Sequence, residues 1–322
     1  MTSHTAKRPC SFQIGTFMTG KWHHNRYELR KELGYGANGI VYLAQSVRGT
    51  VAVKFSDNNA TIASEVNVLK SFAKAQGDSL GPSLIDVDDY VVNGKIYPFY
   101  VMEFIQGDSL LAFLRKRGNE WLNVLSLQLL TQLEKLHQLG WVFGDLKPEN
   151  LIIQWPEQRI RFIDVGGTTQ QGRAIKEYTE YFDRGYWGLG GRRAEPSYDL
   201  FSLAMIMMTA AYGGRVPKRE GGLKELRERV KDKKELAVIE PVLMKAFAGK
   251  YASAGEMKRE LAAYMQRQSN RRKHSAVQTS RMQMRNAKGK SGRRKGGRIA
   301  ETLFLILLVT LLYAIYMLGL VV

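Results

Sequence analysis

The stretch Phe143-Gly-Asp-Leu-Lys-Pro-Glu-Asn150 gathers charged and polar side chains between two apolar segments. A helix is predicted before it, from Trp121 to Leu139, and a short apolar run, Leu151-Ile-Ile153, follows it. A turn at Trp155-Pro156 then leads to a second run, Arg161-Phe-Ile-Asp-Val-Gly166. The pattern predicts two strands joined as a hairpin. Such a hairpin brings four polar side chains to one edge: Asp145, Lys147, Asn150 and Asp164.

Oxygen donors at this edge suit a divalent metal ion. Asn150 and Asp164 offer hard oxygen ligands, which Mg²⁺ or Mn²⁺ prefers together with the phosphate oxygens of a substrate. Asp145 stays free to accept a proton from a hydroxyl group. The competing interpretation is a polar loop with an Asx turn, which accounts for this stretch alone but not for the motifs that precede it.

A glycine-rich stretch, Gly34-Tyr-Gly36-Ala-Asn-Gly39, separates two strand-like runs near the start of the chain. Glycine has no Cβ, so backbone N–H groups in such a loop can approach an anionic ligand closely. No helical pattern begins directly after Gly39, which argues against a dinucleotide-binding βαβ unit. For this stretch alone an ordinary glycine-rich hairpin is the alternative. The wider pattern predicts three antiparallel strands over residues 27–55.

Lys54 and Glu65 form the next predicted pair. Lys54 closes the strand Val51-Ala-Val-Lys54, and Glu65 lies on the polar side of an amphipathic helix. A lysine on a strand that faces a glutamate on a helix can form an ion pair that holds the ammonium group at a phosphate. Either residue alone is typical of a solvated surface charge. The apolar side of the helix carries Ile62, Val66, Leu69, Phe72 and Ala73.

These motifs, in this order, resemble the Hanks-type protein kinases over residues 25–265. Gly34-x-Gly36-x-x-Gly39-x-Val41 is similar to their glycine-rich loop, and Lys54 with Glu65 is similar to their phosphate-anchoring pair. Asp145 to Asn150 resembles the catalytic loop, and Asp164-Val-Gly166 resembles the metal-binding triplet. The resemblance implies an α+β, bilobal protein-kinase fold with a small β-rich N-lobe and a large helical C-lobe. The Lys-Pro-Glu-Asn form after the aspartate resembles serine/threonine kinases rather than tyrosine kinases.

The resemblance also implies an ATP site and roles for its residues. Lys147 is expected to stabilise the transferring γ-phosphoryl group, and Asp199 to brace the backbone of the catalytic loop. We therefore predict ATP-dependent phosphoryl transfer to Ser or Thr of a protein substrate, with autophosphorylation. The alternative is a catalytically inactive pseudokinase scaffold at the membrane or nucleoid. An adenine slot with a gatekeeper and a hinge is expected at Val41, Ala52, Ile152, Met102 and Glu103 to Ile105.

The activation segment departs from the family pattern. Phe143-Gly144 stands where the family has His-Arg, so the arginine that pairs with a phosphorylated loop is missing. We therefore expect activation to be independent of that pairing and Gly144→Arg to leave activity little changed. The family's Ala-Pro-Glu is scrambled as Ala194-Glu-Pro196, and the arginine partner of its glutamate corresponds to Lys250. The candidates for autophosphorylation are Thr168, Thr169, Tyr178, Thr179 and Tyr181.

Most of the excess positive charge lies in one segment. The 322 residues carry a formal net charge of +18, and residues 266–298 supply 12 basic residues and no acidic one. We predict a basic, disordered juxtamembrane linker there. Two ligands are open for it: anionic lipid headgroups, and double-stranded DNA bound with a steep salt dependence. Contact with either surface would raise the local kinase concentration, so we expect transient self-association to favour autophosphorylation.

The last segment predicts a membrane anchor. Twenty residues from Leu303 to Val322 carry no charge, and as a helix they extend about 30 Å, the thickness of the hydrocarbon core of a bilayer. A buried helix of a soluble protein is the alternative, but such helices rarely run this long without a polar face. Basic residues from Arg293 to Arg298 precede the span, so the positive-inside rule places the kinase part in the cytoplasm.

We therefore predict a single-pass protein of the cell membrane. Its lone Cys10 excludes an internal disulfide and fits a reducing compartment. This architecture is similar to that of the membrane-tethered YabT-like kinases of spore-forming Gram-positive bacteria, which implies a role in sporulation. The predicted parts are a flexible N-terminus at 1–24, a kinase domain at 25–265, the linker at 266–298 and a transmembrane helix at 299–322.

Overall fold

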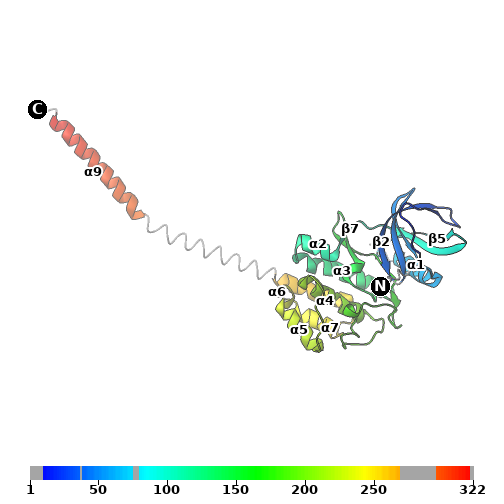
Figure 1. Cartoon of the computed structure of the whole chain (residues 1–322). Helices are drawn as coiled ribbons and strands as arrows, with labels where there is room; N and C mark the ends of the chain where they lie inside the picture. The colour runs from blue at the N-terminus through cyan, green and yellow to red at the C-terminus, as the bar shows by residue number, and fades with distance from the viewer. Residues whose placement is uncertain (1–9, 37, 75–79, 269–294, 320–322) are drawn as a thin grey trace, which may run out of the picture. The chain divides into compact units, whose positions relative to one another are not determined.

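The computed structural model of the chain describes residues 10–36, 38–74, 80–268 and 295–319, with side chains of the last range described for 301–313. The chain divides into two compact units, with the boundary between Tyr264 and Met265. The first unit contains a β-rich lobe followed by a mainly helical lobe (Figure 1). The predicted α+β, bilobal fold is therefore confirmed.

The small lobe is built on a six-stranded sheet with the strand order β1-β2-β3-β4-β6-β5, and every neighbouring pair is antiparallel. Successive side chains of a strand point to opposite faces, so Ile40, Tyr42 and Ala44 of β3 are buried together. Helix α1 packs against β5 and β6. The small-lobe elements are β1 (Phe17–Thr19), β2 (Arg26–Gly36), β3 (Gly39–Ser46), β4 (Gly49–Phe55), α1 (Asn59–Ala73), β5 (Leu84–Val92) and β6 (Lys95–Glu103).

The large lobe is centred on α4 (Pro196–Tyr212), whose residues from Tyr198 to Ala211 are all buried. Proline at its start costs no helical hydrogen bond, and Gly213 ends it in the left-handed conformation with a φ of 72°. The predicted hairpin is present as β9 (Leu151–Gln154) and β10 (Arg159–Phe162). The other elements are β7 (Gly107–Ser109), α2 (Leu110–Arg117), α3 (Glu120–Gln138), β8 (Trp141–Val142), η1 (Pro148–Asn150), β11 (Thr169–Gln170), η2 (Glu180–Phe182), α5 (Gly222–Asp232), α6 (Lys234–Ala237), α7 (Glu240–Phe247) and a helix over residues 254–268.

Residues 10–25, which we call the N-terminal strap, pack on the small lobe. Strand β1 pairs with β2, and Cys10 is buried, which raises the pKa of its thiol to about 11. The ring of Phe12 contacts Phe55, Tyr90 and Tyr97 with centroid distances of 4.8, 5.4 and 5.1 Å. The prediction of a flexible N-terminus is therefore wrong for residues 10–24, because these apolar side chains complete the core of the small lobe. Residues 1–9 lie outside the described residues.

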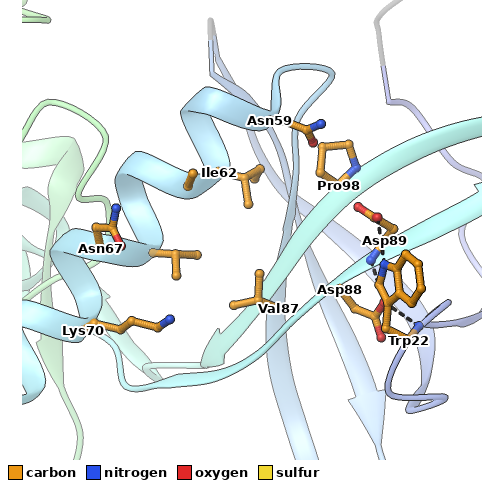
Figure 2. A pocket seen from close by; sticks show the side chains of 11 residues that line it. Trp22, Asn59, Ile62, Asn67, Lys70, Val87, Asp88, Asp89 and Pro98 are labelled. Carbon is orange, nitrogen blue, oxygen red and sulfur yellow. Dashed lines mark hydrogen bonds between the residues drawn. The ribbon is translucent and has the colours of Figure 1, made fainter.

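Aspartates of β5 hold the end of the strap. The backbone N–H of Trp22 donates to the carboxylate of Asp88 at 2.9 Å, and its indole N–H donates to Asp89 at 3.0 Å (Figure 2). The backbone N–H of His23 donates to the second oxygen of Asp88 at 2.8 Å. His23 Nδ1 lies 2.6 Å from an oxygen of Asp86. These contacts fix Trp22 beside the sheet, where its ring becomes part of a groove along α1.

The second unit contains α9 (Lys295–Gly319). The large apolar side chains of its described part, from Leu303 to Tyr313, are exposed. Among the described residues, no helix meets the length and apolar character needed to cross a membrane. The transmembrane helix at 299–322 therefore stays a prediction. Most of the predicted linker, residues 269–294, lies outside the described residues.

Candidate functional site

A cavity of about 870 Å³ opens between the glycine-rich hairpin of the small lobe and the catalytic loop of the large lobe. It is lined by every residue that the sequence analysis assigned to ATP, metal or catalysis, except Glu65, which lies behind Lys54. The structure thus brings together parts of the chain that are more than 100 residues apart. The lining includes Gly34, Gly36, Gly39, Val41, Ala52, Lys54, Met102, Glu103, Ile105, Asp145, Lys147, Asn150, Ile152 and Asp164.

Lys54 is held between two carboxylates. Its Nζ donates to Glu65 at 2.8 Å and to Asp164 at 3.3 Å, and Tyr100 donates to the second oxygen of Glu65 at 2.9 Å. Burial acts to lower the pKa of Lys54, but the charges of Asp164 and Glu65 outweigh it and raise that pKa. Burial raises the pKa of Glu65, whereas Lys54 and the N–H of Gly166 outweigh burial at Asp164 and lower its pKa. The ammonium group therefore stays charged at the back of the cavity.

Strand register sets the predicted adenine slot. Val41 pairs with Lys54 across β3 and β4, and Ala52 pairs with Met102 across β4 and β6. The slot therefore lies directly in front of the Lys54 ammonium group. Ile152 of β9 closes it from the large lobe, and Glu103 begins the hinge with its N–H bonded to the carbonyl of Ser83 at 2.9 Å.

The catalytic loop presents Asp145 and Lys147 to the same cavity. Lys147 Nζ donates to one oxygen of Asp145, and the hydroxyl of Thr179 donates to the other at 2.8 Å. Lys147 also donates to Thr179 at 3.1 Å. Sequence reasoning included Thr179 only among five hydroxyl residues of the activation segment, because no local pattern marks a contact across 34 residues. The structure singles it out as a group that orients the Asp145 carboxylate.

Asp199 of α4 braces the backbone of the catalytic loop, as the resemblance implies. Its carboxylate accepts hydrogen bonds from the N–H groups of Phe143 at 2.8 Å and Gly144 at 2.9 Å, and it lies 2.9 Å from Nε2 of His137. Gly144 adopts a φ of 81°, and a Cβ there would lie 2.7 Å from the carbonyl oxygen of Gly167. This geometry argues against the expectation that Gly144→Arg leaves activity little changed, because any side chain at this position strains the loop.

The activation segment closes on itself and on the glycine-rich loop. Glu195 of the scrambled Ala194-Glu-Pro196 stretch forms an ion pair with Arg184. The sequence had suggested Lys250 as the counterpart of the family's arginine partner. Asn38 of the glycine-rich loop donates to Glu177 of the activation segment. Spacing in the sequence carries no signal for either contact, since both depend on how the segment folds back.

The donor set at the cavity fits a divalent cation. The amide nitrogen of Asn150 donates to the carbonyl of Asp145 at 2.9 Å, which turns its oxygen away from that contact. Oδ1 of Asp164 accepts from Lys54 and from Gly166, and within the described contacts its second oxygen is not engaged. The lowered pKa of Asp164 keeps this carboxylate ionised. An amide oxygen and a carboxylate oxygen are ligands that Mg²⁺ or Mn²⁺ accepts.

Two other features have no predicted site residue. A second cavity of about 430 Å³ lies between α1 and the strands β5 and β6, with Trp22 at one side (Figure 2). His23, Asp86 and Asp88 lie close enough together to suggest a metal site. The N–H groups of the strap, however, already donate to these carboxylates, which explains the cluster as a structural clasp.

Comparisons with known proteins agree with this geometry. The family described as "Protein kinase domain" matches residues 27–281. The serine/threonine-protein kinase YabT of Bacillus subtilis (strain 168) is 46% identical over 323 residues, which cover 95% of each chain. The probable serine/threonine-protein kinase YbdM of the same organism is 25% identical over 63% of this chain and 77% of its own. The structure of vaccinia related kinase 3 superposes with a TM-score of 0.58 at 19% identity, over 80% of this chain and 92% of its own, which shows the fold. The chain therefore belongs to the protein kinase family, in its serine/threonine class, and is an ATP-dependent phosphotransferase.

Proposed function

We propose that the chain transfers the γ-phosphoryl group of ATP to Ser or Thr hydroxyls of proteins, using the cavity between its lobes. The observation that carries the proposal is the ion pair between Lys54 and Glu65, which lies in one site with Asp145, Asn150 and Asp164. Each task of phosphoryl transfer has a side chain at this site, which argues against the inactive scaffold.

The residues act mainly by positioning and by charge stabilisation. Lys54 holds phosphate oxygens, because Glu65 keeps its ammonium group at the back of the slot. Asn150 and Asp164 would hold a divalent cation, which when bound neutralises charge on the phosphates. Asp145 orients the attacking hydroxyl and receives its proton, and Lys147 stabilises the charge that develops on the transferring group.

The test is transfer of labelled phosphate from ATP to the protein itself and to a generic basic protein. Wild type is compared with Asp145→Asn, which keeps the size of the side chain but cannot accept the proton. We expect the variant to lose about 10²–10⁴-fold in rate while it still binds ADP. Transfer that is absent in wild type under all metal and salt conditions would favour the pseudokinase scaffold instead.

We also propose that residues 299–322 anchor the kinase in the cell membrane, with its catalytic part in the cytoplasm. The support is the run of twenty uncharged residues from Leu303 and the exposed apolar side chains of α9, which in water would be unfavourable. Extraction of membranes tests this: the full chain is expected to leave the membrane with detergent but not with high salt.

We also propose that the basic segment 266–298 binds anionic lipid next to the anchor. It has 12 basic residues and no acidic one, and anionic headgroups attract such a segment. Double-stranded DNA offers the same charge and is the competing ligand. Binding of the full chain and of a 266–298 deletion is compared on vesicles with and without anionic lipid, and on duplex DNA in matched salt. If the deletion loses DNA binding but binds anionic vesicles as well as the full chain does, DNA is the ligand of the segment.

A further inference from the structure

Arg161 was predicted only as part of a strand, yet both terminal nitrogens of its guanidinium group donate hydrogen bonds near the boundary between the lobes. It belongs to β10 of the large lobe and lies three residues before Asp164. Its side chain is 8% exposed. A buried charge needs hydrogen-bond partners, and the partners of Arg161 show which segments it connects.

The guanidinium group bonds to three separate segments. Nη1 and Nη2 donate to the two carboxylate oxygens of Glu103 at 3.4 and 3.1 Å. Nη2 also donates to the carbonyl of Gly81 at 2.8 Å, and Nη1 donates to Gln154 at 2.9 Å. Arginine alone among the basic side chains offers such a planar fork of donors. The strand that leads to Asp164 is thus tied both to the hinge and to the loop after α1.

Glu103 and this loop are also bonded to each other. The N–H of Glu103 donates to the carbonyl of Ser83 at 2.9 Å, and the N–H of Ser83 donates back to the Glu103 carboxylate at 3.1 Å. Gly81 lies against Phe72 of α1, so that a Cβ there would be 3.1 Å from its ring. Arg161 therefore closes a bonded ring that fixes the hinge relative to the helix of Glu65.

We propose that Arg161 is a positioning residue that sets how tightly the hinge recognises adenine. Glu103 lines the ATP cavity, and its backbone is expected to face the amino edge of the base. Because the guanidinium group holds the Glu103 carboxylate, it fixes the orientation of that backbone before the nucleotide arrives. The inference rests on the proposed ATP site. It concerns recognition of the base and leaves the phosphate contacts to Lys54.

Binding of Mg-ADP and Mg-IDP to the full chain in detergent, measured by calorimetry, tests the proposal. IDP has the same phosphates but lacks the exocyclic amino group of adenine. In Arg161→Met we expect ADP to bind about tenfold more weakly, the equivalent of one charged hydrogen bond, and IDP to change far less. In kinetics, the KM for ATP is expected to rise more than kcat falls, and Arg161→Lys to restore only part of the affinity.

Arg229→Met is the matched control, because Arg229 forms a buried ion pair with Glu225 in the large lobe and does not line the cavity. We expect it to lower the unfolding temperature without changing the ratio of ADP to IDP affinity. If Arg161→Met does not fold, Glu103→Gln weakens the same contact and is expected to shift the ratio in the same direction. An unchanged ratio in the folded Arg161 or Glu103 variant overturns the inference. Wild type that binds no ADP overturns the ATP site itself.

Discussion

Gly144 carries a backbone conformation on which the position of Asp145 depends. Its φ of 81° is open to glycine and costly for other residues, and the carbonyl of Gly167 occupies the place of a side chain. Asp199 accepts hydrogen bonds from the N–H groups of Gly144 and of Phe143 before it, so the backbone cannot leave this conformation without losing these bonds. The missing arginine is therefore explained by geometry rather than by the mode of activation.

Gly144→Ala is expected to destabilise the protein by about 1–3 kcal/mol and to lower kcat at least tenfold. Urea unfolding and phosphate transfer measure the two effects. Gly214→Ala is the control, since that glycine has no atom near a Cβ position and no positive φ. A Gly144→Arg variant with wild-type activity would show that the loop tolerates another conformation.

The local sequence pattern predicted the site residues that belong to a motif. It missed the residues that reach the site only through the tertiary fold. Lys54 and Glu65 lie 11 residues apart on a strand and a helix, so alternation and helical periodicity were enough to pair them. Thr179 and Arg161 reach their partners across 34 and 58 residues. Nothing in the sequence around either residue encodes those contacts, because they depend on the path of the activation segment and on the packing of the lobes.

At the scale of an element, α4 supports the catalytic loop through one buried carboxylate. Asp199 accepts three hydrogen bonds, two from backbone N–H groups of the loop and one from the imidazole of His137. The helix itself is apolar and buried, so it provides a rigid base for this single polar contact.

Asp199→Asn is expected to destabilise the protein by about 1.5–3 kcal/mol and to lower kcat, because an amide group has one acceptor and would direct its NH₂ at a donor. Equilibrium unfolding and steady-state kinetics provide the measurement. Asp232→Asn serves as the control, since Asp232 accepts from Tyr212 at an exposed site of α5. Equal stability of the two variants would contradict the bracing role.

The N-terminal strap gives the small lobe a pH-dependent contact. The hydrogen bond to Asp86 raises the pKa of His23 above its usual value of 6.5. Since the folded-state pKa is the higher one, the stabilisation is complete below pH 6.5 and is lost as the pH rises through the raised value.

We expect the difference in unfolding temperature between wild type and His23→Gln to be largest at pH 6 and to disappear at high pH. Thermal unfolding from pH 6 to pH 9 measures it. His24→Asn is the matched control, because His24 has a φ of 56° that asparagine also adopts. A difference that does not vary with pH would remove the histidine from this contact.

At the scale of the whole molecule, the chain divides into the catalytic unit and a second unit, for which we propose a separate task. Residues 1–264 form one compact unit that contains the complete cavity. The fold of this unit followed from five motifs, whereas the strap escaped notice because its apolar residues are irregularly spaced. The predictions of the anchor and of the basic segment rest on composition, which indicates the kind of surface that a segment contacts but not the structure that it adopts.

A chain that ends at residue 265 is therefore expected to keep phosphate transfer to a soluble substrate and to lose autophosphorylation that depends on surface density. Vesicles that carry the full chain at increasing density measure the second effect: the rate per molecule should rise with density. A rate per molecule that stays constant would mean that the kinase modifies itself without a partner copy.

The contacts of the strap also bear on the order in which the nascent chain can fold. Its partners Asp86, Asp88 and Tyr90 leave the ribosome some 60 residues or more after it, and all of them precede residue 103. The nascent small lobe can therefore close before the large lobe exists. The partner Asp164 of Lys54 follows 110 residues later, so only the small-lobe wall of the adenine slot can form first, and Ile152 and Asp164 of the large lobe complete the site afterwards.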